Sequence, residues 1–188
     1  GHYSLGHAAL SIGLSALRQI EPVEVAASHM KALASRIAAS CGVVIWTDLG
    51  PVIVRWYRSA RFAISTVALG DVLPLDNTAC GQVFQAFLPA QRIEAARERQ
   101  PEAFRGRRGD ERQHAQVRAE CFAERVEHIF TSVTGKAAPI FDAQGELVCV
   151  VTTVSAVDAA TAEGHADALR QVAAQVCVQT GGNYSSMR

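Results

Sequence analysis

A helix start that directly follows an apolar segment is the feature that most constrains this chain. Residues 73–75 are apolar, Asn77 and Thr78 are both favoured N-cap residues, and a helical pattern begins after them. The first turn of a helix has backbone N–H groups without partners, and these groups attract carboxylate or phosphate. Residues 79–81 are small enough for a ligand to approach this backbone closely. The segment predicts a capped helix start that either binds an anion or is only hydrated.

Helical and strand patterns alternate along the rest of the chain. Apolar spacing, with Pro22 suited to a first turn and Gly42 to a helix end, predicts helices at residues 3–18, 22–41, 89–99, 109–121 and 161–180. Runs rich in β-branched and aromatic residues predict strands at residues 43–47, 52–57, 61–67, 129–133, 136–141 and 147–154, the last two joined by a turn at 142–145. We therefore expect an α+β fold, with an antiparallel six-stranded sheet flanked by helices.

Composition and charge exclude several classes of protein. The 188 residues are 49% hydrophobic, which suits one globular domain, and no apolar run approaches the roughly 20 residues that span a bilayer. No secretion-signal pattern is present, so a cytoplasmic protein without membrane contact is expected. The 18 basic residues balance the 18 acidic ones, and residues 91–127 interleave Arg with Glu. A DNA-binding face needs a basic surplus, so this chain is not expected to contact DNA itself.

Cysteine and histidine positions argue against a metal or cofactor site. The five cysteines are dispersed without C-x-x-C spacing, a pattern that indicates reduced cytosolic thiols. None of the six histidines has zinc-ligand spacing to another ligand. We therefore expect no metal ion and no cofactor.

Gly70, the pair Leu73-Pro74 and the run Thr78-Ala79-Cys80-Gly81 follow one another closely. This succession resembles the most recognisable segment of the IclR family of bacterial transcription regulators. The likeness extends over nearly the whole chain, through residues 3–6, the two helices that follow, residues 135–145 and Gly181-Gly182.

Five positions depart from the family pattern. Gln82 stands where the family usually has lysine, Cys121 where it has glycine, and Arg125 and Val126 where relatives often carry acidic residues. Lys136, one of two lysines, stands where an aliphatic residue is usual; it is expected to face away from any pocket, at a sheet rim or subunit contact. The identity of the effector therefore does not transfer from the family.

The resemblance implies a GAF-like fold and a regulatory function without enzymatic activity. It implies that residues 1–188 form a single effector-binding domain and that a winged helix-turn-helix DNA-binding domain is absent from this chain. The implied partners are a small-molecule carboxylate effector, further copies of the chain in a dimer or tetramer, and DNA only through the missing N-terminal domain.

The same resemblance implies a ligand pocket beside the sheet. The pocket positions are Phe62, Ser65, Leu75, Thr78, Ala79, Cys80, Arg125, Gly135, Thr152 and Val154. Thr152 lies in an otherwise apolar strand, where its hydroxyl either hydrogen-bonds a ligand oxygen or has no functional role. Arg125 either binds a carboxylate through both oxygens or is a surface residue.

Two alternatives to a sensor domain remain open. Cys80 at the helix start could be the nucleophile of an enzyme, with His128 as its base. The chain could instead serve assembly alone, with bulky side chains such as Phe62 and Trp56 filling the pocket. Trp56 could also stack on an aromatic effector, or belong to the core or an interface.

Overall fold

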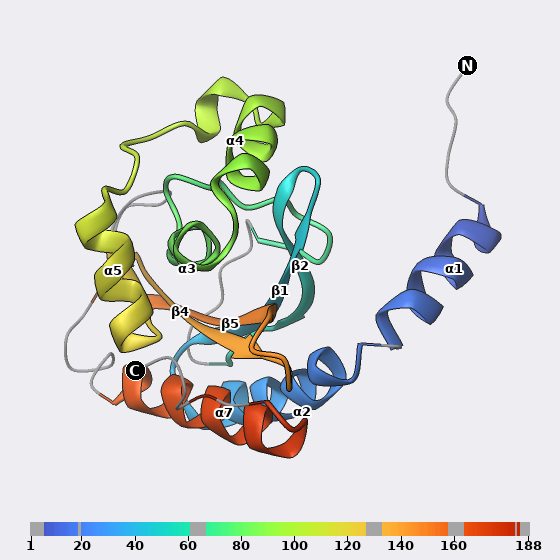
Figure 1. The fold of residues 1–188 in the computed structure, drawn as a ribbon. Helices are drawn as coiled ribbons and strands as arrows, with labels where there is room; N and C mark the ends of the chain where they lie inside the picture. The colour runs from blue at the N-terminus through green and yellow to red at the C-terminus, as the bar shows by residue number, and fades with distance from the viewer. Residues whose placement is uncertain are drawn as a thin grey trace.

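The computed structural model describes residues 6–18, 20–60, 67–126, 133–157, 164–182 and 184, and its centre is an antiparallel sheet (Figure 1). The strands are β1 (Ser40–Thr47), β2 (Gly50–Tyr57), β3 (Ala123–Val126), β4 (Val133–Phe141) and β5 (Leu147–Ala156). Their order across the sheet is β2-β1-β5-β4-β3. Helices cover both faces, so the expected α+β architecture is confirmed.

The predicted number of strands was wrong, because five rather than six pair in the described part of the chain. Of the predicted strand at 61–67, residues 61–66 lie outside the described residues and Val67 is not in a strand. Of that at 129–133, only Val133 is described, and it begins β4. The sequence analysis missed β3, which has four residues, two of them charged. Such a segment has no strand pattern of its own and is held by pairing with β4, Ala123 opposite Ala137 and Arg125 opposite Gly135.

Two hairpins build most of the sheet. The β1–β2 hairpin turns at residues 48–49, and its register shifts at a bulge between Val43 and Val44. The predicted turn after β4 is confirmed, since the Asp142 carboxylate accepts hydrogen bonds from the backbone N–H groups of Gln144 and Glu146, both at 2.9 Å.

The free edge of β2 is covered by the segment that leads to the predicted helix start. Ile53 N–H donates to the Asp71 carbonyl at 3.0 Å, Gly70 N–H to the Ile53 carbonyl at 2.8 Å, and Leu73 N–H to the Pro51 carbonyl at 2.7 Å. Residues 70–73 therefore satisfy backbone groups that an edge strand would otherwise expose.

Helices α2 (Glu21–Arg36) and α7 (His165–Gln179) pack on one face of the sheet (Figure 1). Their apolar stripes include Met30 and Leu33 of α2 and Leu169 of α7. All three are buried against the side chains of β1, β4 and β5 that face these helices. The prediction that Gly42 ends α2 was wrong. The helix ends at Arg36, and Gly42 lies inside β1. Lys136 of β4 also faces this side, where its Nζ lies 3.0 Å from Glu124.

The other face carries α3 (Ala79–Phe87), α4 (Ala90–Arg99), a 3-10 turn (Glu102–Phe104) and α5 (Glu111–Glu120). A second core lies beneath α3 and includes Val44, Val83, Phe84 and Val150. Cys121 caps α5 in the left-handed conformation, with φ 46°, a conformation that glycine adopts most readily.

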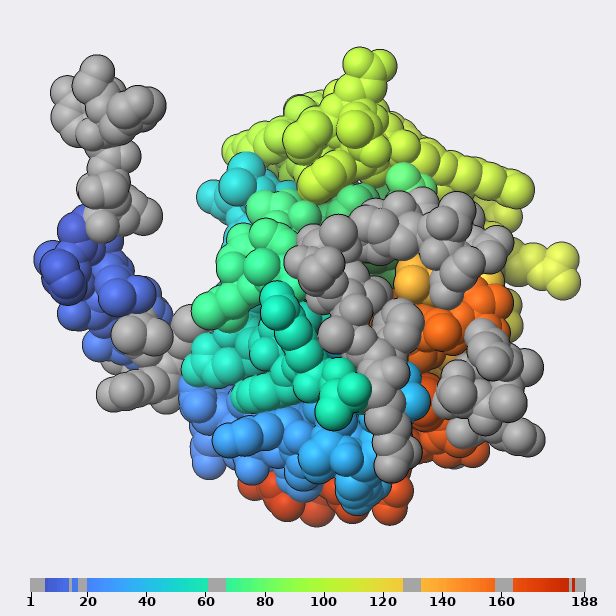
Figure 2. All heavy atoms as spheres, turned by 180° about the vertical axis from the view of Figure 1, so that it is seen from behind, coloured from blue at the N-terminus to red at the C-terminus, as the bar shows by residue number. Residues whose placement is uncertain are grey.

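Helix α1 (His7–Arg18) extends away from the body of the molecule (Figure 2). Its Leu10 and Ile12 side chains are 61% and 72% exposed. No helix in the described residues combines the length and apolar character needed to cross a membrane.

A Schellman motif ends α7 at the predicted Gly181-Gly182 pair. Gly182 N–H donates to the Cys177 carbonyl at 2.7 Å, Gly181 N–H to the Val178 carbonyl at 3.4 Å, and Gly181 has φ 74°. A Cβ atom on Gly182 would lie 2.0 Å from the Phe141 carbonyl oxygen, so the helix end packs directly against the end of β4.

We expect Gly182→Ala to lower the free energy of unfolding by about 1–3 kcal/mol, because the added methyl group clashes with backbone that cannot move freely. The matched control is Gly13→Ala in α1, where a Cβ meets nothing within 4 Å and alanine favours the helix. Urea unfolding of both variants measures the difference. Equal stabilities would contradict the close approach.

Candidate ligand-binding site

Of the two N-cap candidates predicted from the sequence, Thr78 is the N-cap of α3. Its Oγ1 accepts a hydrogen bond from Gly81 N–H at 2.9 Å and donates to the Pro74 carbonyl at 2.8 Å. Asn77 is not the cap, because its side-chain amide donates to the carbonyls of Phe104 and Arg105. The cap leaves the N–H groups of Ala79 and Cys80, in the first turn, without an intrahelical acceptor.

The absence of a side chain at Gly81 allows close packing on the neighbouring backbone rather than access for a ligand. A Cβ on Gly81 would lie 2.0 Å from the Leu75 carbonyl oxygen, so the helix start rests on that backbone. Leu75 itself is only 1% exposed and is not among the residues that line the cavity described below, so the structure does not place this predicted pocket residue with the others. Gln85 donates to the Leu75 carbonyl at 2.9 Å and fixes the same turn from inside α3.

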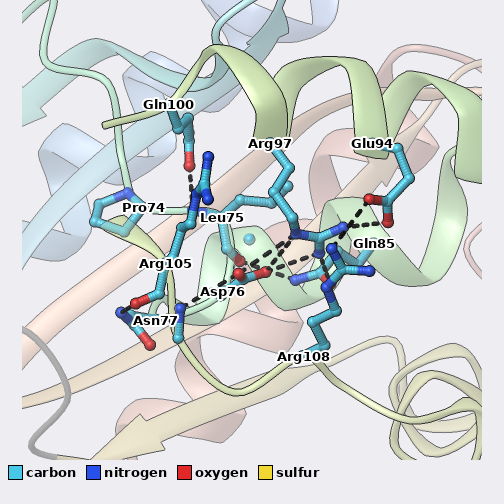
Figure 3. A network of polar contacts seen from close by, with 12 residues as sticks. Pro74, Leu75, Asp76, Asn77, Gln85, Glu94, Arg97, Gln100, Arg105 and Arg108 are labelled. Atoms are coloured by element: carbon cyan, nitrogen blue, oxygen red, sulfur yellow. Dashed lines mark hydrogen bonds and ion pairs between the residues drawn. The ribbon is translucent and has the colours of Figure 1, made fainter. Parts of the chain in front are cut away.

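A buried ion pair holds the turn before α3 (Figure 3). Arg97 of α4 donates to the Asp76 carboxylate, from Nη2 at 2.7 Å and from Nε at 3.1 Å, and to Gln85 Oε1 at 2.9 Å. Asp76 and Arg97 are 3% and 6% exposed, and Glu94 also pairs with Arg97. Burial alone would lower the pKa of Arg97, but its hydrogen bonds and charge attraction to Asp76 and Glu94 raise that pKa above its ordinary value.

Gln100 ties three backbone segments to the same region. Its Oε1 accepts from Leu75 N–H, and its Nε2 donates to the carbonyls of Leu49 and Leu73, each at 3.0 Å. One buried side chain therefore joins the β1–β2 turn, the segment along β2 and the turn before α3. These contacts fix the position of the helix start relative to the sheet.

A cavity of about 80 Å³, partly open to solvent, lies between the start of α3 and the sheet. Its lining combines side chains of β2, β3, β4 and β5 with the capped turn: Ile53, Trp56, Val67, Leu73, Asn77, Thr78, Ala79, Cys80, Arg125, Val133, Gly135, Thr152 and Val154. The lining is mainly apolar, as ligand pockets usually are.

Seven of the ten predicted pocket residues line this cavity: Thr78, Ala79, Cys80, Arg125, Gly135, Thr152 and Val154. Phe62 and Ser65 lie outside the described residues, as does His128. The structure thus brings together residues from four segments of the chain: residues 78–80, β3, β4 and β5. That they bind a ligand remains a prediction.

The sequence analysis missed most of the lining from β2 and from the segment before α3. Ile53, Val67, Leu73, Asn77 and Val133 were not predicted as pocket residues, and Trp56 was given several alternatives. Strict alternation would place residues 53 and 56 on opposite faces of a strand. The bulge in the β1–β2 ladder places both at the cavity, and no sequence signal shows this bulge.

The Thr152 hydroxyl already has an acceptor, because it donates to the Lys136 carbonyl at 2.8 Å. It can therefore accept a hydrogen bond from a ligand, but it has no proton left for a ligand oxygen. The neighbouring Cys80 thiol is 2% exposed, and burial raises its pKa to about 12. Cys80 is thus a neutral thiol near pH 7, which argues against the nucleophile alternative.

Arg125 reaches the cavity from β3 and is oriented by α3. We assign the Gln82 amide with its oxygen toward the guanidinium, where it accepts from Arg125 Nε at 2.7 Å and from Nη2 at 3.0 Å. Nη2 also lies 3.4 Å from the Asp76 carbonyl. Burial, and then the charge of Arg107, lower the pKa of Arg125, although an arginine stays protonated. The glutamine that departs from the family pattern therefore acts as a neutral acceptor for this arginine.

Within the described residues, no cluster of three or more His, Cys, Asp or Glu side chains is arranged to hold a metal ion. The cavity lining contains one cysteine and none of the other three residue types. Its chemistry suits an organic ligand with an apolar body.

The sequence family described as the C-terminal domain of the bacterial transcriptional regulator IclR matches residues 14–178. None of the curated proteins compared with the chain matches it.

Solved structures with the same fold include regulators from several bacteria. HmgR of Pseudomonas aeruginosa is 27% identical, with a TM-score of 0.76 over 98% of this chain and 76% of that chain. The Thermotoga maritima IclR structure is 20% identical, with a TM-score of 0.74 over 95% of this chain and 76% of that chain. A putative IclR regulator from a Silicibacter species is 16% identical, with a TM-score of 0.81 over 98% of this chain and 76% of that chain. At 20% and 16% identity, the latter two show the fold alone.

Arg97→Ala should lower the free energy of unfolding by about 3–5 kcal/mol, since it leaves the buried Asp76 carboxylate without its partner. The matched control, Arg99→Ala, removes an exposed arginine two residues along α4 and should cost at most about 1 kcal/mol. Chemical denaturation of the two variants measures the difference. If Arg97→Ala were no more harmful than Arg99→Ala, the ion pair would not hold the turn.

In the folded chain we expect Cys80 to resist alkylation by iodoacetamide near neutral pH, because a buried thiol with a raised pKa supplies almost no thiolate. Mass spectrometry of peptides gives the extent of modification. Unfolding in urea should make all five cysteines reactive and serves as the control. Rapid modification of Cys80 in the folded chain would revive the nucleophile alternative.

Proposed function

The chain belongs to the IclR family of bacterial transcriptional regulators, and from this membership we propose that residues 1–188 form one domain that binds a small carboxylic acid and assembles with further copies. DNA binding would belong to a separate winged helix-turn-helix domain. The balanced charge of the chain agrees with DNA binding by a separate domain, because this chain has no basic surplus for phosphate contacts. As a regulator of bacterial transcription, the protein would act in the cytoplasm.

The polar end of the cavity is the observation that carries the proposal. Ala79 and Cys80, whose N–H groups lack intrahelical acceptors, line the same cavity as the Arg125 guanidinium. A helix start favours negative charge, and a guanidinium can bind both oxygens of a carboxylate. The apolar residues around them suit the carbon skeleton of an organic acid. A small carboxylic acid matches both parts of this lining.

The acid would act through linkage between binding and conformation. A ligand that binds one conformation or assembly better than another shifts the population toward it, and the attached DNA-binding domains respond. Because β3, β4, β5 and α3 all line the cavity, a ligand there would contact both the sheet and the helical layer. Small shifts between these two layers are the changes that the ligand could select.

The other two functions have less support. Two observations argue against an enzyme with Cys80 as its nucleophile: the family consists of regulators, and the Cys80 thiol is buried and neutral. Against an assembly-only domain stands the cavity itself, since Trp56 forms part of its wall and leaves it open.

A panel of small aliphatic and aromatic carboxylic acids should contain at least one that stabilises the chain against heat. At 100 times its Kd a ligand adds about 2.7 kcal/mol of stability, which for a domain of this size raises Tm by about 5–10 °C. Arg125→Ala should weaken or abolish this shift, because it removes the guanidinium from the cavity. Differential scanning fluorimetry measures both effects.

The matched control is Arg112→Ala, which removes an exposed arginine of α5 that does not line the cavity and should leave the shift unchanged. If no acid raised Tm, the assembly-only function would replace the sensor. If Arg125→Ala and Arg112→Ala behaved alike, the acid would bind elsewhere.

A further inference from the structure

A surface groove of about 550 Å³ lies where the tip of the β1–β2 hairpin meets α4 (Figure 1). Residues 71–74 and the hairpin tip line it on one side, and residues 99–104 line it on the other. Leu49, Val72, Pro101 and Phe104 make the lining mainly apolar, and Leu49 is 48% exposed. Soluble monomers rarely expose large contiguous apolar surface, so a groove of this kind indicates an interaction surface.

The same surface also carries an apolar projection. Leu69 lies in a turn in which Asp71 Oδ2 accepts from Ala68 N–H at 2.7 Å and Asp71 N–H donates to the Ala68 carbonyl at 3.3 Å. Val67 and Asp71, on either side of this turn, line the groove, and Leu69 is 67% exposed. A surface with both a groove and a projecting side chain can pair with a copy of itself across a two-fold axis.

The charges of the groove are self-complementary as well. Asp71 lines one side and Arg99 the other, and both side chains are exposed. Arg99 Nη1 donates to the Asp48 carbonyl at 3.1 Å, but within the described residues neither Asp71 nor Arg99 belongs to an ion pair. In a two-fold interface a residue pair occurs twice, so one acid and one base on the same surface can form two ion pairs.

The groove shares part of its lining with the ligand cavity. Val67 and Leu73 line both. A ligand that displaces these two side chains in the cavity would therefore also change the groove. An effector can control assembly only if it favours one arrangement of the copies over another, and a shared wall provides that connection.

We propose that two copies of this chain meet at the groove across a two-fold axis. Asp71 of each copy would pair with Arg99 of the other, and Leu69 of each copy would enter the groove of the other. Pairing of β2 strands is not available on this side, because residues 70–73 already cover the edge of β2. This inference rests on the assembly part of the proposed function.

Charge reversal tests the pairing. In Asp71→Arg the two-fold contact joins arginine to arginine, and in Arg99→Asp it joins aspartate to aspartate, so each variant alone should self-associate about tenfold more weakly or worse. A mixture of the two variants restores an Arg–Asp pair at both positions and should associate about as tightly as the parent chain. Sedimentation velocity over a concentration series gives the Kd of each sample. Rescue in the mixture also shows that both variants fold.

Arg112→Asp is the matched control, because it makes the same charge change at an exposed arginine of α5 that does not line the groove. It should self-associate like the parent chain and should not rescue Asp71→Arg. Leu69→Ser is an independent variant that leaves both charges and the backbone of the turn in place. It should weaken self-association about tenfold, as the loss of a buried apolar anchor does.

The outcomes separate this inference from the proposed function. If the parent chain self-associates but the charge variants and Leu69→Ser keep its Kd, or the mixture does not regain it, the copies meet elsewhere and the inference is refuted while assembly stands. If the parent chain stays a monomer throughout the concentration series, the assembly part of the proposed function fails and this inference fails with it.

Discussion

The buried ion pair between Asp76 and Arg97 is the contact on which the cavity depends. It joins the turn before α3 to α4, across 21 positions of sequence. Leu75, the neighbour of Asp76, supplies the carbonyl against which Gly81 packs. Any displacement of this turn would therefore move the first residues of α3 and, with them, the backbone N–H groups at the cavity. The polar end of the cavity is thus held by contacts behind it.

The two faces of the sheet differ in side-chain size, and this difference creates the cavity. On the face under α2 and α7 the strands carry Val43, Ile140 and Val151, which pack against Met30 and Leu33 without exposure to solvent. On the opposite face Gly135 and Thr152 line the cavity beside the start of α3. The absence of a side chain at Gly135 leaves space that the helical layer does not fill, whereas the space above Gly42 is taken by the Trp56 ring. The cavity therefore depends on single small residues in strands that are otherwise ordinary.

Local patterns predicted the parts of the fold that local interactions determine. The capped start of α3, the turn after β4 and four of the strands could be predicted because N-cap, turn and alternation signals lie within a few residues. The Arg97 and Gln100 contacts could not, since nothing near either residue shows that its partners lie elsewhere in the chain. The same limit applies to β3, which needs β4, and to Trp56, whose direction depends on a bulge. Seven residues of the cavity lining were predicted as pocket residues through the family resemblance; Leu75 is not part of this lining, and its carbonyl instead supports the start of α3 at Gly81.

The covered edge of β2 restricts how copies of this domain can meet. An open edge strand invites a second chain to add to the sheet, which is a common route to aggregation. Residues 70–73 already bind the carbonyls of Pro51 and Ile53 and the Ile53 N–H group, and Val72 bridges Val52. A continuous sheet between two copies cannot form through this part of β2. Assembly there must rely on side-chain contacts. Such an assembly can be reversible and can respond to a ligand, and it does not extend the sheet into a fibril.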